Sequence, residues 1–274
     1  MSVKDRINEA SGGDLFPDVV DDVLDRYGYT ILSFALGITL WETVVFLAPD
    51  LVTLAPPSAA AEQLTVLITG GKLWGAWIVS IQHMFAGYAL AIVIAIPLGF
   101  MMARVEWIRW AVNPFIDALY STPSLVFIPL IIVWFGLFFY ARVAMVFLMC
   151  FFEILITTLT GVSSIDENYL DVARSFDLSW WDRQRNVLLP ASLPHVFTGL
   201  HLGAGRAVRG MIVAEIFLAL VGLGGLLEEA GQSYATDEQL AIIVFITLTG
   251  IAMQKLVLWT EEWTIPWSHT EEEE

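Results

Sequence analysis

Four charged side chains interrupt stretches that are otherwise apolar and long enough to cross a membrane, and their chemistry raises the first question about function. They are Glu153, Arg206, Arg209 and Glu215. A charge inside hydrocarbon faces a partner or water, because exposing it to lipid is costly. Two roles fit the arginines: an internal ion pair with Glu153, or attraction of an oxoanion, which suits the planar guanidinium fork. We therefore treat the four residues as candidates for a translocation pathway.

The elements that hold these groups are expected to be helices. Counted from Pro194 at about 1.5 Å per residue, Arg206 lies roughly 18 Å along its helix, near the middle of a bilayer. The same helix carries small residues on nearly one stripe: Gly199, Gly203, Ala207, Gly210 and Ala214. Small residues let helix backbones approach closely in lipid. The stripe fits either packing within one subunit or the seam of a homodimer.

A polar segment, residues 163–194, separates two apolar runs and is too charged to lie in hydrocarbon. Ser164 and Glu167 have the spacing of a capping box, which predicts the start of a short helix. The apolar residues that follow at helical spacing are Ile165, Tyr169, Val172 and Phe176. Such a helix presents one apolar face that is available to a soluble partner.

A second short helix is expected in the same segment. Ser179 and Asp182 repeat the N-terminal signal, and the helix should run to Leu188. Pro190 favours a break there, because the residue before a proline is biased away from helical angles. Pro194 suits the first turn of the following span. The segment therefore reads as two short helices joined by a turn, on one side of a membrane.

This segment resembles the EAA loop of permease subunits in binding-protein-dependent ABC importers. The family pattern is Glu-Ala-Ala, three residues, Gly, nine residues, Ile, any residue and Leu-Pro, and its spacing is kept here. The matching residues are Asp171, Val172, Ala173, Asp177, Val187, Leu189 and Pro190. The resemblance implies that the loop inserts into a groove of a separate ATPase subunit and transmits its motion. Asp177 replaces the family Gly, and a left-handed turn there costs Asp roughly 1 kcal/mol.

The resemblance extends from about residue 55 to Trp267. Over this range the chain is similar to the nitrate, sulfonate, taurine and bicarbonate type of permease. His83 stands where that subfamily often has Arg. The ordered matches include Pro57-Ser58, Gly71-Lys72-Leu73-Trp74, Ser80, Gly87, Ile96-Pro97-Leu98-Gly99, Pro114, Thr122-Pro123, Ile128-Pro129-Leu130, Trp134-Phe135-Gly136, Gly161 and Ala214-Glu215. The resemblance implies the type I ABC importer permease fold, a homodimer and an extracytoplasmic binding protein that delivers a small oxoanion.

Composition supports an all-α integral membrane protein. The chain has 274 residues, of which 57% are hydrophobic and 15% charged, and a spanning helix needs about 20 apolar residues. We expect about six transmembrane helices: 30–48, 77–103, two within 111–162 that turn at 139–142, 196–221 and 240–259. The expected domains are an acidic N-terminal segment 1–29 that includes a short surface helix, a permease domain 30–267 with the coupling loop 163–194, and an acidic tail 268–274.

The distribution of basic residues predicts the orientation. Six spans place both termini on one side, and the opposite side then carries only Lys72 and Arg142. The basic residues on the side of the termini are Lys4, Arg6, Arg26, Arg104, Arg109, Arg174, Arg183 and Arg185. The positive-inside rule therefore predicts a multi-pass plasma-membrane protein with cytoplasmic termini and a cytoplasmic loop 163–194.

Charge and cysteine content exclude other classes. Lys and Arg number 13 against 29 Asp and Glu, a formal net charge of −16, which argues against nucleic acid as a partner. Such an acidic balance is typical of a host with a salt-rich cytoplasm, a hypothesis that growth of the host only at low salt would remove. The single Cys150 allows no disulfide framework and no thiolate metal cluster within one chain.

The energy source is expected on another chain. The nearest candidate for a phosphate-binding loop, Gly71-Lys72, is followed by Leu73 and has Val66 where the earlier glycine belongs. We therefore expect no catalysis, no cofactor and no metal on this chain, with ATP and magnesium on the partner ATPase. The alternative is an ion-gradient-driven secondary transporter, a class that commonly shows an inverted repeat, which this sequence lacks by eye. A membrane-embedded enzyme is a third reading, but no cluster has catalytic spacing.

Overall fold

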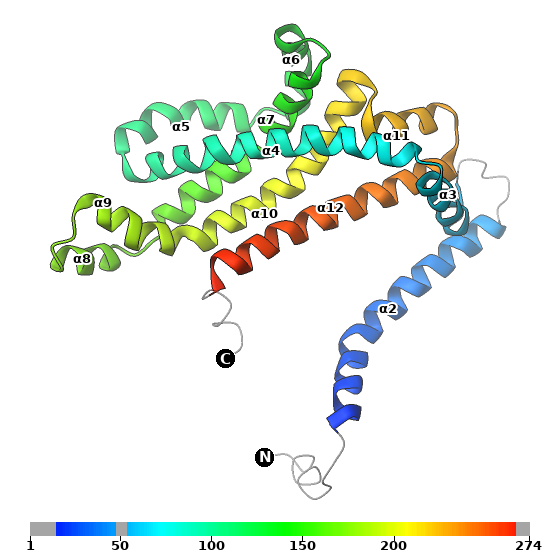
Figure 1. Ribbon diagram of the computed structural model, residues 1–274, viewed down its shortest axis with the longest axis horizontal. Coiled ribbons are helices and arrows are strands. Elements are labelled where there is room, and N and C mark those ends of the chain that lie inside the picture. Colours follow the sequence, from blue (N-terminus) through cyan, green and yellow to red (C-terminus); the bar gives the residue numbers. More distant parts are fainter. Residues whose placement is uncertain (1–14, 48–53, 267–274) are drawn as a thin grey trace, which may run out of the picture. The chain divides into compact units, whose positions relative to one another are not determined.

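The computed structural model describes residues 15–47 and 54–266, and in that part every regular element is helical (Figure 1). The four-residue and five-residue elements η1, η2 and η3 are tighter or wider helical turns that adjoin α-helices. In chain order the elements are α2 (Leu15–Leu47), α3 (Pro57–Thr69), α4 (Lys72–Arg104), α5 (Glu106–Tyr120), η1 (Ser124–Phe127), α6 (Ile128–Phe135), α7 (Phe139–Ser163), α8 (Glu167–Ser175), α9 (Trp180–Arg183), η2 (Gln184–Leu188), α10 (Leu189–Ala214), η3 (Glu215–Ala219), α11 (Gly222–Gln232) and α12 (Thr236–Thr264).

The chain divides into two compact units, Met1–Glu62 and Gln63–Glu274. In the first unit, the Glu42 carboxylate of α2 accepts hydrogen bonds from the Ser58 N–H (3.2 Å) and hydroxyl (2.6 Å) at the start of α3. A carboxylate is favourable there because the N-terminus of a helix carries partial positive charge. The separate surface helix expected before the first span is wrong, since α2 is one continuous helix whose apolar part is Gly28–Leu47.

Three long helices, α4, α7 and α10, form the centre of the second unit, and α12 packs along α10 (Figure 1). The small-residue stripe of α10 is buried against α7 of the same chain. A Cβ added at Gly203 would lie 2.7 Å from Ile154 Cγ1, and one at Gly210 would lie 3.1 Å from Val146 Cα. The stripe therefore packs within the subunit. Of the two roles expected for it, the structure supports this one and not the seam of a homodimer.

The number of spans depends on two bent pairs. In the described part, four helices are long and apolar enough to cross a membrane, namely Gly28–Leu47, α4, α7 and α12, and up to six if each bent pair forms one span. The pairs are Glu106–Tyr120 with Ser124–Phe135, bent by 97°, and Trp180–Ala219 with Gly222–Gln232, bent by 63°. The expectation of about six all-helical spans is consistent with this upper count.

The two spans expected within residues 111–162 meet at a different turn. The connection is Gly136–Phe138, where Gly136 adopts φ +68°, so residues 139–142 form the first turn of α7 rather than the loop. The first of the two spans is also not straight, because the chain bends between α5 and η1 at Pro123. Proline cannot donate a backbone hydrogen bond and restricts the residue before it, which is the physical reason for this bend.

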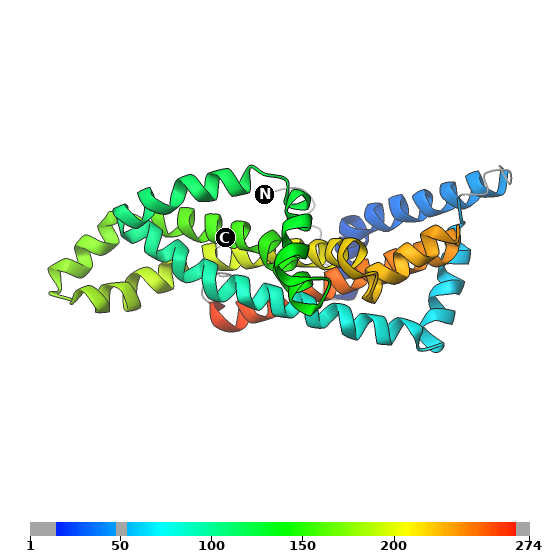
Figure 2. The ribbon, with the colours of Figure 1, turned by 90° about the horizontal axis from the view of Figure 1, so that it is seen from above.

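The break expected at Pro190 does not occur. Leu189 has helical angles (φ −60°, ψ −53°), and the chain runs from α9 through the π-helical turn η2 into α10, which contains Pro194 in its interior. The π-helical turn before Pro190 shifts the backbone hydrogen bonds by one residue. The Pro190 ring therefore avoids the clash with the carbonyl four residues earlier that would break a regular α-helix. The part of the loop that begins at α9 and the span that carries the arginines are therefore continuous helix. In both views α8 and α9 lie at the end of the second unit opposite to α11 (Figure 2).

Candidate functional site

The start of α8 is capped by a residue that the sequence analysis did not select. Asp166 Oδ1 accepts a hydrogen bond from the Asn168 N–H at 2.9 Å. The capping box expected between Ser164 and Glu167 is wrong, because α7 extends to Ser163 and Ser164 ends it, donating its hydroxyl to the Gly161 carbonyl at 2.8 Å. The second signal is confirmed, since the Ser179 hydroxyl accepts from the Asp182 N–H at 3.2 Å.

The end of α8 has the left-handed turn that the family glycine suggested. Asp177 has φ +54°, and the Leu178 N–H donates to the Ala173 carbonyl at 3.4 Å, which closes the helix end. An aspartate tolerates this conformation better than most residues, although it costs more than glycine. Ala173, in the alanine position of the motif, is 3% exposed. The motif spacing thus matches a real turn in the chain.

The outer side of this helix pair is apolar and open. Tyr169, Val172 and Phe176 are 63%, 58% and 75% exposed, and we call these three residues the apolar loop face. Trp180 and Trp181 of α9 are also exposed, with ring centroids 4.6 Å apart in an edge-to-face pair. Large apolar side chains gathered on one surface usually mark a contact with another protein or a membrane.

The remaining motif residues connect this loop to α10. Val187 is half-buried, Leu188 is buried at 1% exposure, and Leu189 is exposed. Pro190 lies in the first turn of α10 and is half-buried. A displacement of the loop would therefore pass directly into the helix that carries Arg206, because no flexible linker lies between them.

Two cavities lie beside α10 in the second unit. The larger, about 470 Å³, is bounded by the segment between α5 and η1, by α7 and by Arg206. Three hydroxyl residues, Ser121, Thr122 and Ser124, give it polar walls. The smaller cavity, about 300 Å³, is lined by Glu153, His201, Leu202, Gly205, Arg206, Arg209 and Gln254. Three of the four residues selected from the sequence therefore meet at these cavities.

The ion pair that was one of the two readings of the arginines is present. Arg206 Nη2 lies 2.5 Å from Glu153 Oε1, and the side chains are 41% and 16% exposed. Arg209, one turn further along α10, is exposed and has no ion-pair partner among the described residues. The smaller cavity thus contains one neutralised and one uncompensated guanidinium.

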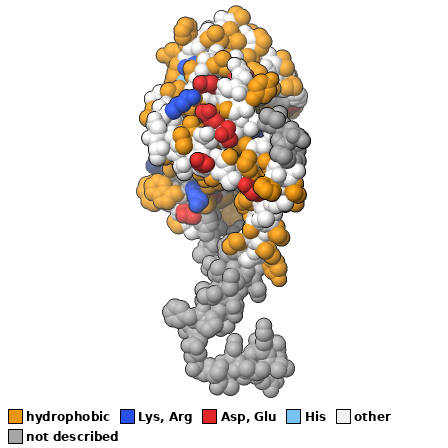
Figure 3. Space-filling model, turned by 90° about the vertical axis from the view of Figure 1, so that its right-hand side faces the viewer, with side chains coloured by type: hydrophobic (Ala, Val, Ile, Leu, Met, Phe, Trp, Pro, Cys, Tyr) orange, Lys and Arg blue, Asp and Glu red, His pale blue; other side chains and the backbone are white. Residues whose placement is uncertain are grey.

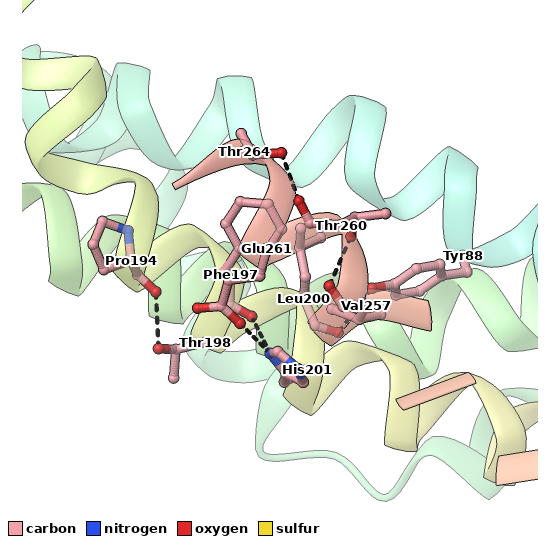
Figure 4. Close-up of polar contacts among 10 residues, drawn as sticks. All are labelled: Tyr88, Pro194, Phe197, Thr198, Leu200, His201, Val257, Thr260, Glu261 and Thr264. Carbon is pink, nitrogen blue, oxygen red and sulfur yellow. Dashed lines mark hydrogen bonds and ion pairs between the residues drawn. The ribbon is translucent and has the colours of Figure 1, made fainter. Parts of the chain in front are cut away.

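His201, at the edge of the smaller cavity, is held in place by its neighbours (Figure 4). Its Nδ1 lies 3.0 Å from the Phe197 carbonyl and 3.5 Å from Glu261 Oε2 of α12. Both partners accept hydrogen bonds only, so Nδ1 carries the hydrogen. Nearby, the Tyr88 hydroxyl of α4 donates to the Leu200 carbonyl at 2.8 Å, which ties a third helix to the same turn of α10.

Glu215, the fourth selected residue, lies away from both cavities. It begins η3 and is 0% exposed, and its Oε2 accepts the Gly224 N–H at 2.9 Å. Its Oε1 lies 3.5 Å from His83 Nδ1, and His83 Nε2 accepts from Arg142 Nε at 2.9 Å. Since an arginine only donates, Nε2 is unprotonated and Nδ1 of this neutral imidazole carries the hydrogen. Glu215, His83 and Arg142 form what we call the sealed cluster, in which Glu215 and His83 are buried and Arg142 lies at the partly exposed edge.

Sequence reasoning missed two polar groups of the smaller cavity. His201, Gly205 and Arg209 follow one another at intervals of four residues and therefore lie on one face of α10. This spacing was the available signal that His201 shares the cavity with Arg209. Gln254 is a polar residue inside the apolar α12, and this type of residue in a span deserved selection for the same reason as the arginines.

The end of the second unit that carries α11 is charged (Figure 3). Lys72 Nζ lies 3.4 Å from Glu229 Oε1 and 3.7 Å from Glu238 Oε1. Gln63 donates to Asp237 Oδ2 at 3.1 Å. These contacts link the start of α4 to α11 and to the start of α12, and the start of α12 to α3, at the end opposite to the apolar loop face.

Comparison with known proteins defines the class. Residues 95–264 match the family described as the binding-protein-dependent transport system inner membrane component. A probable ABC transporter permease of Brucella melitensis is 30% identical over 234 residues, which cover 85% of this chain and 94% of the relative. The taurine transport system permease protein TauC of Escherichia coli is 27% identical, covering 87% of this chain and 89% of that protein. Other relatives at 27–30% identity are named for aliphatic sulfonates, nitrate and bicarbonate.

A solved structure shares the fold. An amino acid ABC transporter solved with histidines superposes with a TM-score of 0.59 at 18% identity, covering 73% of this chain and 97% of that one. The chain therefore belongs to the permease components of binding-protein-dependent ABC importers, of the nitrate, sulfonate, taurine and bicarbonate type. It is a multi-pass membrane permease, and membership of this family displaces the reading as a secondary transporter.

Proposed function

We propose that two copies of this chain form the inward pathway for a small oxoanion, such as a sulfonate, nitrate or bicarbonate, in an importer driven by a separate ATPase. Relatives named for these solutes support the substrate class. The uncompensated guanidinium of Arg209 supports it independently, because it gives the smaller cavity a net attraction for anions. Arg206, Glu153 and Glu215 complete the residues proposed for the pathway, with Glu215 acting from outside the cavities.

The observation that carries coupling to the ATPase is the apolar loop face beside the buried Ala173. These residues stand at or near the motif positions, and the described residues leave more than half of the Tyr169, Val172 and Phe176 side chains exposed. A groove of the ATPase subunit would bury them, which is the usual role of an apolar helix face that fits a partner. ATP and magnesium would bind that partner, and this chain would contribute no catalysis and bind no cofactor.

The proposed orientation follows from the loop. An ATPase is cytoplasmic, so the apolar loop face and both termini belong on that side, as the basic residues also predict. The charged end that carries Lys72 and Glu229 then faces outward, where a binding protein would deliver the solute. This arrangement gives each end of the permease a distinct partner.

A second copy is proposed because of Arg209. Its side chain is exposed on the single chain, within the middle part of a spanning helix, and a guanidinium in contact with lipid is unfavourable. A partner copy that covers this face of α10 would enclose the cavities and keep them wet. The face to be covered includes the exposed Leu202 and Arg209, and it differs from the face of the small-residue stripe, which packs on α7.

Changing the loop tests the coupling. We expect Asp171→Lys and Ala173→Trp to abolish co-purification of the ATPase, since Trp does not fit where Ala173 is buried and Lys reverses a charge on the docking helix. Gln232→Lys, an exposed substitution at the opposite end, is the matched control and should keep the ATPase bound. Normal ATPase recovery with both loop variants would contradict the proposed docking.

Changing the arginines tests the solute class. We expect Arg206→Gln and Arg209→Gln to reduce ATP-dependent uptake of nitrate or taurine into vesicles severalfold while the ATPase remains associated. Unchanged uptake of every oxoanion in both variants would remove the arginines from the pathway.

A further inference from the structure

The two cavities share one wall, and that wall is the Glu153–Arg206 ion pair. Both residues line the larger cavity, and both line the smaller one. No other residue belongs to both linings. The carboxylate comes from α7 and the guanidinium from α10, so the contact at 2.5 Å closes the space between two helices.

The chemistry of this wall makes it exchangeable. A carboxylate and a small oxoanion offer a guanidinium the same feature, namely oxygens that accept two parallel N–H bonds. Arg206 has five N–H donors, and the ion pair to Glu153 uses Nη2. With side chains 41% and 16% exposed, the pair is open to the cavities rather than sealed in the core. An anion in either cavity can therefore reach the same cation.

We propose that Glu153 is a built-in competitor for the transported anion: it holds Arg206 while the site is empty, and an oxoanion passes between the cavities by replacing it. This inference rests on the proposed function, because it takes the solute to be an anion. Arg206 is then an anion-binding residue that is occupied in turn by Glu153 and by the solute.

The surrounding charges fit such an exchange. Among the residues that line the smaller cavity, Glu153, Arg206 and Arg209 leave one net positive charge; the Glu261 carboxylate contacts His201 but is not part of the lining. Arg209 attracts the anion, and in the larger cavity the Ser124 hydroxyl can donate to it, whereas the Ser121 and Thr122 hydroxyls already donate to the Asp117 and Ala118 carbonyls. An anion that must displace a carboxylate binds less tightly and leaves more readily than one that meets two free guanidinium groups. The pair thus limits the affinity of a site whose purpose is passage.

The test compares the response to nitrate of the permease bound to its ATPase in lipid nanodiscs, at constant ionic strength maintained with gluconate. We expect Glu153→Gln to lower the melting temperature without nitrate, since Arg206 loses its partner, and nitrate to restore it. The nitrate concentration for the half-maximal rise in melting temperature should be about tenfold lower than in the unchanged protein, because no carboxylate competes. That change corresponds to about 1.4 kcal/mol.

Two further variants complete the test. Glu153→Gln/Arg206→Gln should lose the response, since the binding cation is absent. Glu262→Gln, which removes an exposed carboxylate of α12, should respond like the unchanged protein. Methanesulfonate in place of nitrate examines whether the site accepts a second oxoanion.

Three results would overturn the competitor role. They are equal half-maximal nitrate concentrations in Glu153→Gln and the unchanged protein, an equal response in the double variant, and no response in any of them. A destabilised Glu153→Gln that nitrate does not restore would make the pair a structural contact only. Failure of the proposed function is distinguished by a separate measurement: the unchanged transporter would then show no ATP-dependent uptake of an oxoanion.

Discussion

Glu153 and Glu215 are both carboxylates beside basic side chains in one helical unit, yet their surroundings differ in kind. Glu153 meets Arg206 directly at 2.5 Å and borders two cavities. Glu215 is fully buried, faces His83 at 3.5 Å, and accepts the Gly224 N–H at the start of α11. The first carboxylate can change partners, whereas the second is fixed by packing on every side.

The difference separates a carboxylate that can exchange its partner from one that is held in place. The sealed cluster joins α4, α7, η3 and α11, and Ser80 extends it by accepting the Leu223 N–H at 2.8 Å. Gly222 leaves no room for a side chain, since an added Cβ would clash with Glu215 Oε1. A polar network of this kind is costly to disturb, because each group left unpaired stays without water. The open pair has no such constraint.

The largest effect is expected from Glu215→Ala. Removing this carboxylate leaves the buried Gly224 N–H without an acceptor and opens a cavity, which should cost about 3 kcal/mol of unfolding free energy. Denaturation in mixed detergent micelles measures the loss. Glu262→Ala, at an exposed position, should stay near the unchanged protein. A loss no greater than this control would show that the sealed cluster is not a structural support.

His83→Phe should come next. The ring volume is roughly kept, but Arg142 and Glu215 lose the imidazole between them, for an expected cost of about 2 kcal/mol. His201→Phe is the counterpart at the open cavity, where the lost contacts are partly exposed, and should cost less than half as much. Thermal unfolding of both variants in the same lipid decides the order. If the two histidines prove equivalent, the contrast between sealed and open regions fails.

A gain is expected at Asp177. Replacement by Gly relieves the left-handed backbone at φ +54° and should stabilise the end of α8 locally by about 1 kcal/mol. Hydrogen exchange of the Leu178 amide, which bonds to the Ala173 carbonyl, reports this change. Neither glutamate lies in this loop, so the sealed cluster and the ion pair should be unaffected. Faster exchange at Leu178 would be evidence against backbone strain.

The smallest change in stability is expected from Glu153→Gln/Arg206→Gln. Replacing both members of an ion pair leaves no uncompensated charge, so the unfolding free energy should change by less than about 1 kcal/mol. The measurement is the same micelle denaturation as for Glu215→Ala. If this double variant unfolded as readily as Glu215→Ala, the pair would belong to the architecture after all.

Local residue spacing predicted the turn and the second cap inside the coupling loop, but not where the loop begins and ends. The family glycine position falls on a left-handed turn at Asp177, and the predicted Ser179 cap is confirmed. The cap at Ser164 was wrong because α7 continues over the expected boundary and uses that residue to end itself. Pro190 signalled a break that a π-helical turn removes. Such outcomes depend on how the neighbouring helix ends, which short-range patterns do not contain.

By itself the sequence determined that the chain is helical and membrane-spanning, because runs of apolar residues of spanning length have no other stable state in lipid. It also determined the family, through an ordered set of motif positions, and it identified Glu153 as a partner for an arginine. Only the tertiary structure decided that the α10 stripe packs on α7, that Glu215 is sealed against His83, and that Glu153 and Arg206 divide two cavities. The physical reason is that helical periodicity tells which residues share a face, while the packing of other helices decides what that face meets.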